Sequence, residues 1–228
     1  MFENKYSKVL TVVLIIVIVA ILGLLGFLAV DIIQKNSIQS DAEAFVSQFE
    51  SDVGATDQNG ENTNTNSDGN SESNPLEEIE ATKTVINGGS GKQPTYKGYN
   101  VVGIIKIPQI NLEYPIIERV TKDAIEASVA KLYPMENSVN KVGNTVIIGH
   151  NYRNGLFFSR NKELKVNDKI YITDNSGNRL TYTIYNKFET TPEDTSFYTR
   201  DTDNKPEITL STCNDDSSKR LIILAKAE

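Results

Sequence analysis

The stretch EITLSTCNDDSSKRLIILAKA (207–227) places two apolar runs on either side of a short polar loop. Both runs, 207–213 and 220–227, are rich in aliphatic and β-branched residues, which is typical of buried strands. The loop between them, NDDSSK, is made of residue types that favour turns. We therefore predict a hairpin in which Cys213, at the end of one strand, faces Arg220, at the start of the next.

Further strands are predicted upstream of this hairpin. Two of them alternate with period two around NSGN, a sequence typical of a hairpin turn. One helix is predicted, at 122–133. Many short strands with little helix favour a closed barrel or a sandwich over a fold of alternating strands and helices. The upstream strands are predicted at 100–107, 111–120, 144–150, 168–174 and 179–189.

Near the start of the chain, residues 9–30 (VLTVVLIIVIVAILGLLGFLAV) contain no charged side chain. At about 1.5 Å rise per residue, a helix of this length covers about 30 Å, the thickness of the hydrocarbon core of a bilayer. A cleaved signal peptide is the alternative, but its apolar region is usually shorter and ends at a small-residue cleavage site. This run has no clear site of that kind, so we predict an uncleaved transmembrane anchor.

The charges on the two sides of this run predict its orientation. Lys5 and Lys8 precede it, whereas the residues that follow carry more acidic than basic side chains. Lysine and arginine favour the cytoplasmic side of a membrane. Residues 1–8 are therefore expected in the cytoplasm, and everything after residue 31 outside the cell membrane.

Residues 31–97 are predicted to form a stalk and a linker. Apolar residues at partly helical spacing between positions 32 and 50 indicate a short helical extension. Segments 51–75 and 87–94 consist largely of Gly, Asn, Ser, Asp and Thr, a composition that cannot offset its ordering entropy by burial. We expect this part to be disordered and to tether a folded head, residues 98–228.

The composition excludes some functions. The net charge is −7, from 23 basic and 30 acidic residues, and no basic cluster runs against it, so nucleic acid is not expected as a partner. A single cysteine cannot form an internal disulfide, and one cysteine with one histidine cannot fill a zinc shell without carboxylates. We expect no metal and no other cofactor; the sequence does not determine calcium dependence.

His150, Cys213 and Arg220 are candidates for one catalytic site because each is predicted at a strand end. A thiol is mostly protonated at neutral pH, and an imidazole can accept its proton and later protonate a leaving amine. A guanidinium can bind the developing oxyanion. Each residue also has an ordinary interpretation: a buried apolar cysteine, a structural histidine and a solvated arginine. Composition alone leaves both interpretations open.

The motif TLSTC (209–213), the arginine at the start of the following strand and a histidine upstream, in NTVIIGHNYRNGLFF (144–158), resemble the sortases, which are membrane-anchored cysteine transpeptidases. VVGIIKIPQINLEYPI (101–116) resembles the opening strands of that family, so the resemblance covers about residues 98–228. The order of histidine before cysteine differs from that of papain-like peptidases.

This resemblance implies a mainly β fold, a closed β-barrel of about eight strands with one or two short helices. It implies that Cys213 is the nucleophile, His150 the acid and base, and Arg220 the oxyanion and substrate clamp, with Thr212 in the substrate groove. The implied reaction cleaves an LPxTG-like sorting signal through a thioester on the cysteine. The surface protein is then transferred to an amine of a cell-wall precursor.

Features outside the motif bear on the class of sortase. The sequence HNY after the predicted strand and TLSTC favour class B. The segment between Glu189 and Pro206 is shorter than is usual in that class, which leaves a housekeeping or a class D-like enzyme open. That segment, 190–206, is expected to line the groove. Two other functions stand as alternatives: a membrane-tethered cysteine peptidase that transfers the acyl group to water, and a non-catalytic peptide-binding module.

Overall fold

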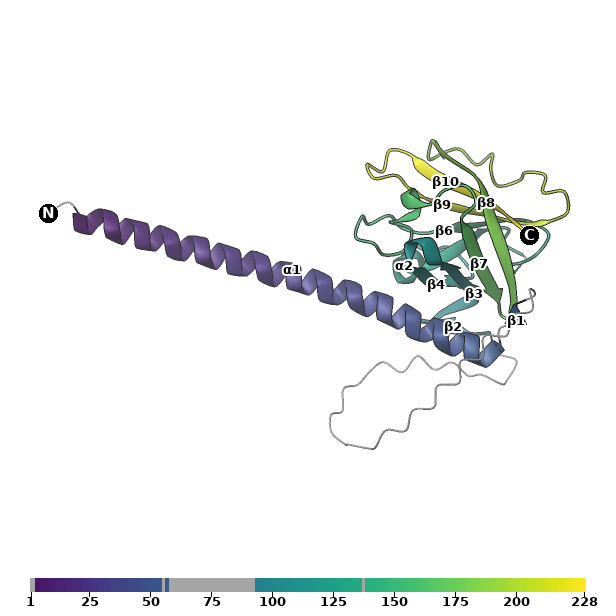
Figure 1. Ribbon diagram of the computed structural model, residues 1–228, viewed down its shortest axis with the longest axis horizontal. Coiled ribbons are helices and arrows are strands. Elements are labelled where there is room, and N and C mark those ends of the chain that lie inside the picture. The colour runs from purple at the N-terminus through teal and green to yellow at the C-terminus, as the bar shows by residue number, and fades with distance from the viewer. Residues whose placement is uncertain (1–2, 55, 58–92, 137) are drawn as a thin grey trace, which may run out of the picture. The chain divides into compact units, whose positions relative to one another are not determined.

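The computed structural model describes residues 3–54, 56–57, 93–136 and 138–228. The chain divides into two units, Met1–Asp41 and Ala42–Glu228. Helix α1 (Glu3–Val53) contributes to both of them (Figure 1). Most of the predicted disordered linker, residues 58–92, lies outside the described residues.

In the first unit, α1 has the length and composition of a membrane-spanning helix. Within the stretch Val9–Val53 of this helix, which continues into the second unit, the most apolar window has a mean hydropathy of 3.3. Every side chain from Val9 to Val30 is exposed, although most of them are large and apolar. The prediction of a long apolar helix over 9–30 is therefore confirmed.

The second unit is built from ten strands and three short helices within the described residues. The strands are β1 (Thr56–Asp57), β2 (Thr95–Tyr96), β3 (Tyr99–Ile107), β4 (Leu112–Ile117), β5 (Val129–Tyr133), β6 (Gly143–Ile148), β7 (Lys169–Asp174), β8 (Asn178–Thr190), β9 (Pro206–Cys213) and β10 (Arg220–Ala227). The helices are η1 (Pro108–Ile110), α2 (Lys122–Ala127) and η2 (Asn161–Glu163).

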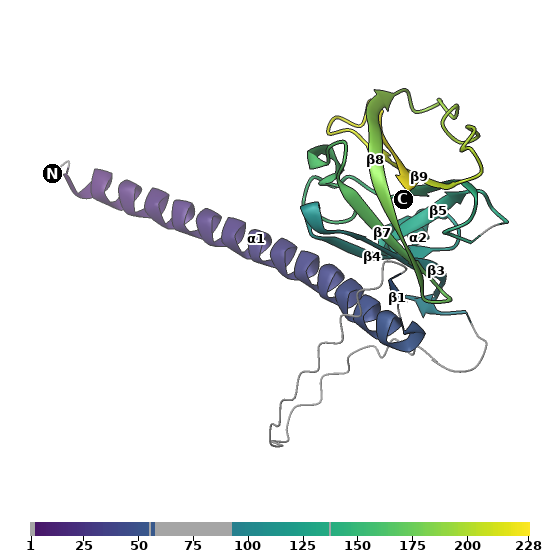
Figure 2. The same ribbon diagram turned by 45° about the vertical axis from the view of Figure 1, so that its right-hand side comes forward.

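Eight of the described strands, β3 to β10, close into a barrel (Figures 1 and 2). They pair in the order β8-β10-β9-β6-β5-β4-β3, and β7 pairs with both β3 and β8, which completes the ring. The short strands β1 and β2 add to β8 and β3. The predicted closed barrel of about eight strands is confirmed, and closure leaves its strands no free edge.

One glycine allows the barrel to close at the β3–β7 contact. A Cβ atom at Gly103 would lie 2.4 Å from the carbonyl oxygen of Thr173 on β7. The register of β3 against β4 also shifts between Val101 and Gly103, as expected where a glycine lets a strand bend. The two backbones therefore approach at a point where any side chain would separate them.

The predicted helix at 122–133 is wrong in its second half. Helix α2 ends at Ala127, and β5 begins at Val129, where it pairs with β4 on one side and β6 on the other. Val129 and Ala130 are fully buried. The local apolar spacing fits a helix, but the ring needs a strand between β4 and β6. Tertiary pairing therefore overrides the local preference.

The end of α1 packs on the barrel, within the second unit. Phe45, Val46 and Phe49 are buried in one apolar cluster with Tyr96 and Val101. An aromatic stack of Phe45 on Phe49, with ring centroids 6.2 Å apart, lies within this cluster. The buried apolar face explains why this segment is helical and ordered: packing of one face stabilises a helix more than propensity does.

A half-buried carboxylate adds an ionic link to this contact. Glu50 of α1 pairs with Lys106 of β3, at 2.7 Å, and with Arg179 of β8. The folded unit thus begins at Ala42, inside the range 31–97 predicted as stalk and linker. The sequence indicated a helical extension in this range but not what that helix contacts.

We expect Phe49→Ala to lower the free energy of unfolding of the second unit by about 3–5 kcal/mol, because the ring is 1% exposed and its removal leaves a cavity. The chain has no tryptophan, so near-ultraviolet circular dichroism of its tyrosines would follow urea unfolding of the detergent-solubilised chain. Gln48→Ala, at an exposed position of the same helix, is the control. Equal stability of the two variants would contradict a structural role for this contact.

Candidate active site

Cys213 and Arg220 lie opposite each other at the loop end of the β9–β10 hairpin. They are register partners, and Arg220 Nη1 donates a hydrogen bond to Cys213 Sγ at 2.7 Å. The hairpin pairing predicted from the sequence is therefore present. A guanidinium at this distance stabilises negative charge on a sulfur, the form in which a thiol is nucleophilic.

The loop after Cys213 is tied to the segment that follows His150. Asn151 Nδ2 donates to the Cys213 carbonyl at 3.0 Å and to Asp215 Oδ1 at 3.1 Å. Lys162 Nζ binds the other oxygen of Asp215 at 2.8 Å. The Lys162 ammonium and the Asn151 amide hold the pKa of Asp215 below its ordinary value. These contacts connect two loops that are distant in the sequence.

The backbone next to His150 is held by the strand that carries the cysteine. Strand β6 runs parallel to β9, and Gly149 N donates to the Ser211 carbonyl at 3.3 Å. Thr212, predicted in the substrate groove, donates its hydroxyl to the Gly149 carbonyl at 2.7 Å, and it is 4% exposed. The Thr212 hydroxyl therefore fixes the backbone that leads into His150.

The imidazole of His150 contacts two side chains that the sequence analysis did not select. Its ring stacks on Tyr152, with centroids 4.6 Å apart and 23° between the planes. Nε2 lies 3.3 Å from Oε1 of Glu126, on α2, and the Tyr152 hydroxyl donates to the other oxygen of Glu126. Burial and the hydrogen bond to Glu126 raise the pKa of the Tyr152 phenol. Tyr152 adjoins the histidine motif, but no sequence signal connects Glu126 to it.

A cavity of about 290 Å³ brings the three predicted catalytic residues together, since His150, Cys213 and Arg220 all line it. The segment 190–206 contributes part of the wall, as expected for a groove-lining loop. Most of the remaining wall is apolar, which favours a ligand with apolar groups. The other lining residues are Ile125, Leu132, Ile148, Gly149, Pro192, Asp194, Phe197, Tyr198, Ser211 and Thr212.

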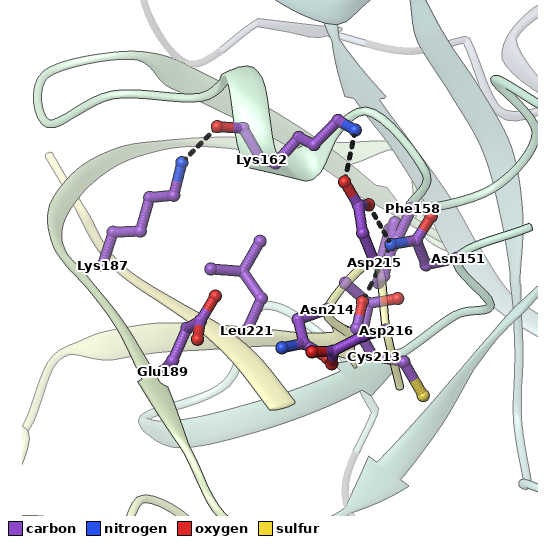
Figure 3. Close-up of a pocket in the computed structure, with 11 residues that line it drawn as sticks. Asn151, Phe158, Lys162, Lys187, Glu189, Cys213, Asn214, Asp215, Asp216 and Leu221 are labelled. Atoms are coloured by element: carbon purple, nitrogen blue, oxygen red, sulfur yellow. Dashed lines mark hydrogen bonds and ion pairs between the residues drawn. The ribbon is translucent and has the colours of Figure 1, made fainter. Parts of the chain in front are cut away.

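A second cavity, of about 410 Å³, also adjoins Cys213 (Figure 3). Most of the residues that line it are polar or charged, among them Lys162, Lys187 and Glu189. The Cys213 sulfur points away from the two lysines in Figure 3, and its partner Arg220 lines the first cavity. We therefore assign the thiol to the first cavity. In the described part of the chain, no group of three or more His, Cys, Asp or Glu side chains is placed to hold a metal ion.

Residues 105–228 match the family model of the sortase domain. The chain belongs to the sortase family. It is 36% identical over 126 residues to sortase A of Bacillus anthracis. The aligned region covers 54% of this sortase and 58% of that relative. It is 33% identical over 133 residues to sortase D of Bacillus subtilis (strain 168), covering 54% and 62%. These alignments span less than two thirds of either relative.

A solved structure gives the same result for the fold. The sortase D5 transpeptidase of Clostridium perfringens superposes on this sortase with a TM-score of 0.51 at 28% identity, covering 57% of this chain and 79% of that one. The relatives carry both class A and class D names, so the comparisons establish the family and not the class.

In this sortase, Gly149 leaves room for the side chains packed behind the catalytic histidine candidate. A Cβ atom there would lie 2.9 Å from Phe158 Cδ2 and 2.9 Å from Val129 Cγ1, and both neighbours are fully buried. We expect Gly149→Ala to cost about 1–3 kcal/mol of stability, because overpacking displaces the backbone.

Peptide cleavage should also fall, since the adjacent His150 moves with that backbone. Thermal denaturation and kcat/KM for peptide cleavage check both effects. Phe158→Leu, combined with Gly149→Ala, should restore part of the loss by making space, which a double-mutant cycle measures. Wild-type stability of the single glycine variant would contradict the close packing.

Proposed function

We propose that this sortase is a cysteine transpeptidase that cleaves an LPxTG-like sorting signal and transfers the acyl part to an amine of a cell-wall precursor. The observation that carries the proposal is the convergence of the sole thiol, the sole imidazole and a guanidinium on one cavity. Membership of the sortase family supports the same reaction class.

The first half of the reaction forms the thioester. The Cys213 thiol gives its proton to His150, and the sulfur attacks the carbonyl carbon of the scissile amide, which forms the S–C bond. Arg220 hydrogen-bonds the oxygen on which negative charge develops. The C–N bond then breaks, and His150 protonates the departing amine.

The second half resolves that thioester. The acceptor amine loses a proton to His150 and attacks the same carbonyl carbon, which forms the new amide bond. The S–C bond breaks, and the Cys213 sulfur leaves as a thiolate stabilised by Arg220 until the imidazolium returns its proton. The same three groups therefore serve both halves, as microscopic reversibility requires of an acid and base pair.

The cavity walls suit this class of peptide. Ile125, Leu132, Ile148 and Phe197 offer apolar contacts for the leucine and proline of an LPxTG-like segment. We further propose that α1 anchors the chain in the membrane with its N-terminus in the cytoplasm. The catalytic unit then meets surface proteins with a sorting signal on the outer side.

The proposal is tested with the full chain in detergent micelles or nanodiscs, because Ala42–Val53 packs on the barrel. The protein is incubated with an LPxTG-type peptide, with and without triglycine, and the products are identified by mass spectrometry. We expect an amide of triglycine. Free acid alone would indicate the hydrolytic alternative, and no product with no thioester on Cys213 would refute the proposal.

A further inference from the structure

The imidazole of His150 has one nitrogen enclosed by the protein. Nε2 is buried, and no hydrogen bond of normal geometry to it occurs among the described residues. Oε1 of Glu126 lies 3.3 Å from Nε2, which is within the distance of an ion pair. The angles at this contact do not fit a hydrogen bond. Catalytic hydrogen bonds are often loose before substrate binds. The Glu126 side chain is 54% exposed, so a small rotation can align it.

Tyr152 and the capped helix α2 place Glu126 beside the histidine ring. Tyr152 donates its hydroxyl to one oxygen of Glu126 and stacks its ring on His150, which leaves the other oxygen toward Nε2. Helix α2, which carries Glu126, is capped at its start by Thr121, whose hydroxyl accepts from Ala124 N at 3.0 Å. The carboxylate is therefore presented by a capped helix and a stacked tyrosine.

We propose that Glu126 is a positioning residue that orients His150 and stabilises its imidazolium form, so that Glu126, His150 and Cys213 act in series. With Nε2 directed at the carboxylate, Nδ1 is the nitrogen left to exchange a proton with the Cys213 thiol. A base oriented by a third group is the general pattern of activated nucleophiles. This inference rests on the proposed function for its catalytic meaning.

Other charged groups around the cavity have different partners. Arg220 binds the Cys213 sulfur. Asp194, which lines the same cavity from the 190–206 loop, accepts from the Thr190 hydroxyl and the Ser196 amide. Glu126 and Tyr152 contact His150 directly, and the other titratable or charged groups in the wall of its cavity are Asp194, Tyr198, Cys213 and Arg220. Of the carboxylates in this set, Glu126 is the one with an ionic contact to the imidazole.

Alkylation of the sole thiol by iodoacetamide, which forms an S–C bond and releases iodide, tests the pairing without any peptide substrate. The rate is measured from pH 5 to pH 10 in the full chain. We expect Glu126→Gln to lower the rate at pH 7 about fivefold, the upper range for an exposed ion pair. At pH 10, where an ordinary thiol is ionised without help, the two rates should be equal.

Two further variants separate a positioning role of Glu126 from the loss of any negative charge on the same helix. Asp123→Asn removes another exposed carboxylate from the same helix and should leave the profile unchanged. Tyr152→Phe keeps the stacked ring but frees one oxygen of Glu126, and should lower the rate at pH 7 about twofold. A Glu126→Gln rate that equals wild type at every pH, or that falls equally at pH 10, would overturn the proposal.

Turnover of the LPxTG-type peptide supplies the second readout. Glu126→Gln should lower kcat about fivefold at unchanged KM, since Glu126 lines no part of the peptide cavity. If wild type turns over no peptide but the alkylation profiles differ as expected, the contact between Glu126 and His150 is supported and the proposed function fails. If wild type is active and neither readout changes in Glu126→Gln, the positioning role of Glu126 is refuted and the proposed function stands.

Discussion

Replacing Cys213 with alanine is expected to lower turnover by about 10⁴-fold or more, the loss typical of removing a covalent nucleophile. Cys213 carries the only sulfhydryl group of the chain, so no neighbouring thiol can replace it. The fold should survive the change. The side chain is half-buried at the end of β9, and alanine leaves the β9–β10 backbone pairing intact.

Mass spectrometry of the protein after brief incubation with the LPxTG-type peptide measures this directly. Wild type should carry the acyl group as a thioester, and Cys213→Ala should carry none. Cys213→Ser, which keeps a polar atom for Arg220 but is not ionised at neutral pH, should be similarly inactive and serves as the control for shape. A normal acyl adduct in the alanine variant would refute the role of Cys213.

Arg220→Lys should give the second largest effect, a loss of about 10²–10³-fold in kcat/KM, as when one oxyanion donor is removed. The charge is conserved, so a purely electrostatic role predicts little change. In the structure one nitrogen, Nη1, is already bound to the Cys213 sulfur. The planar fork keeps further donors for the substrate oxygen, which the single ammonium of lysine cannot reproduce in the same geometry.

Steady-state kinetics on peptide cleavage, with thermal denaturation as a check of folding, measures this effect. Lys219→Ala is the matched control, because Lys219 is the exposed basic neighbour of Arg220 in the sequence. It should retain kcat/KM close to wild type. Cleavage by Arg220→Lys at the wild-type rate would reject the clamp assignment and leave a structural role for the guanidinium.

The sequence alone predicted the parts of this fold that depend on neighbours along the chain. The strands 168–174 and 179–189 and their turn agree closely with β7 and β8, because period-two alternation and a short turn are local signals. The opposition of Cys213 and Arg220 was predicted for the same reason. Once a short loop joins two antiparallel strands, it sets which residues pair across them.

Only the tertiary structure decided the remaining features. Residues 129–133 form a strand because β4 and β6 pair with them, and the end of α1 is ordered because it buries Phe49 against the barrel. Glu126 contacts His150 although 24 positions separate them in the sequence, and no rule of residue spacing predicts such a contact. Local patterns record which face of an element is apolar, whereas partners distant in sequence are selected by the closure and packing of the whole barrel.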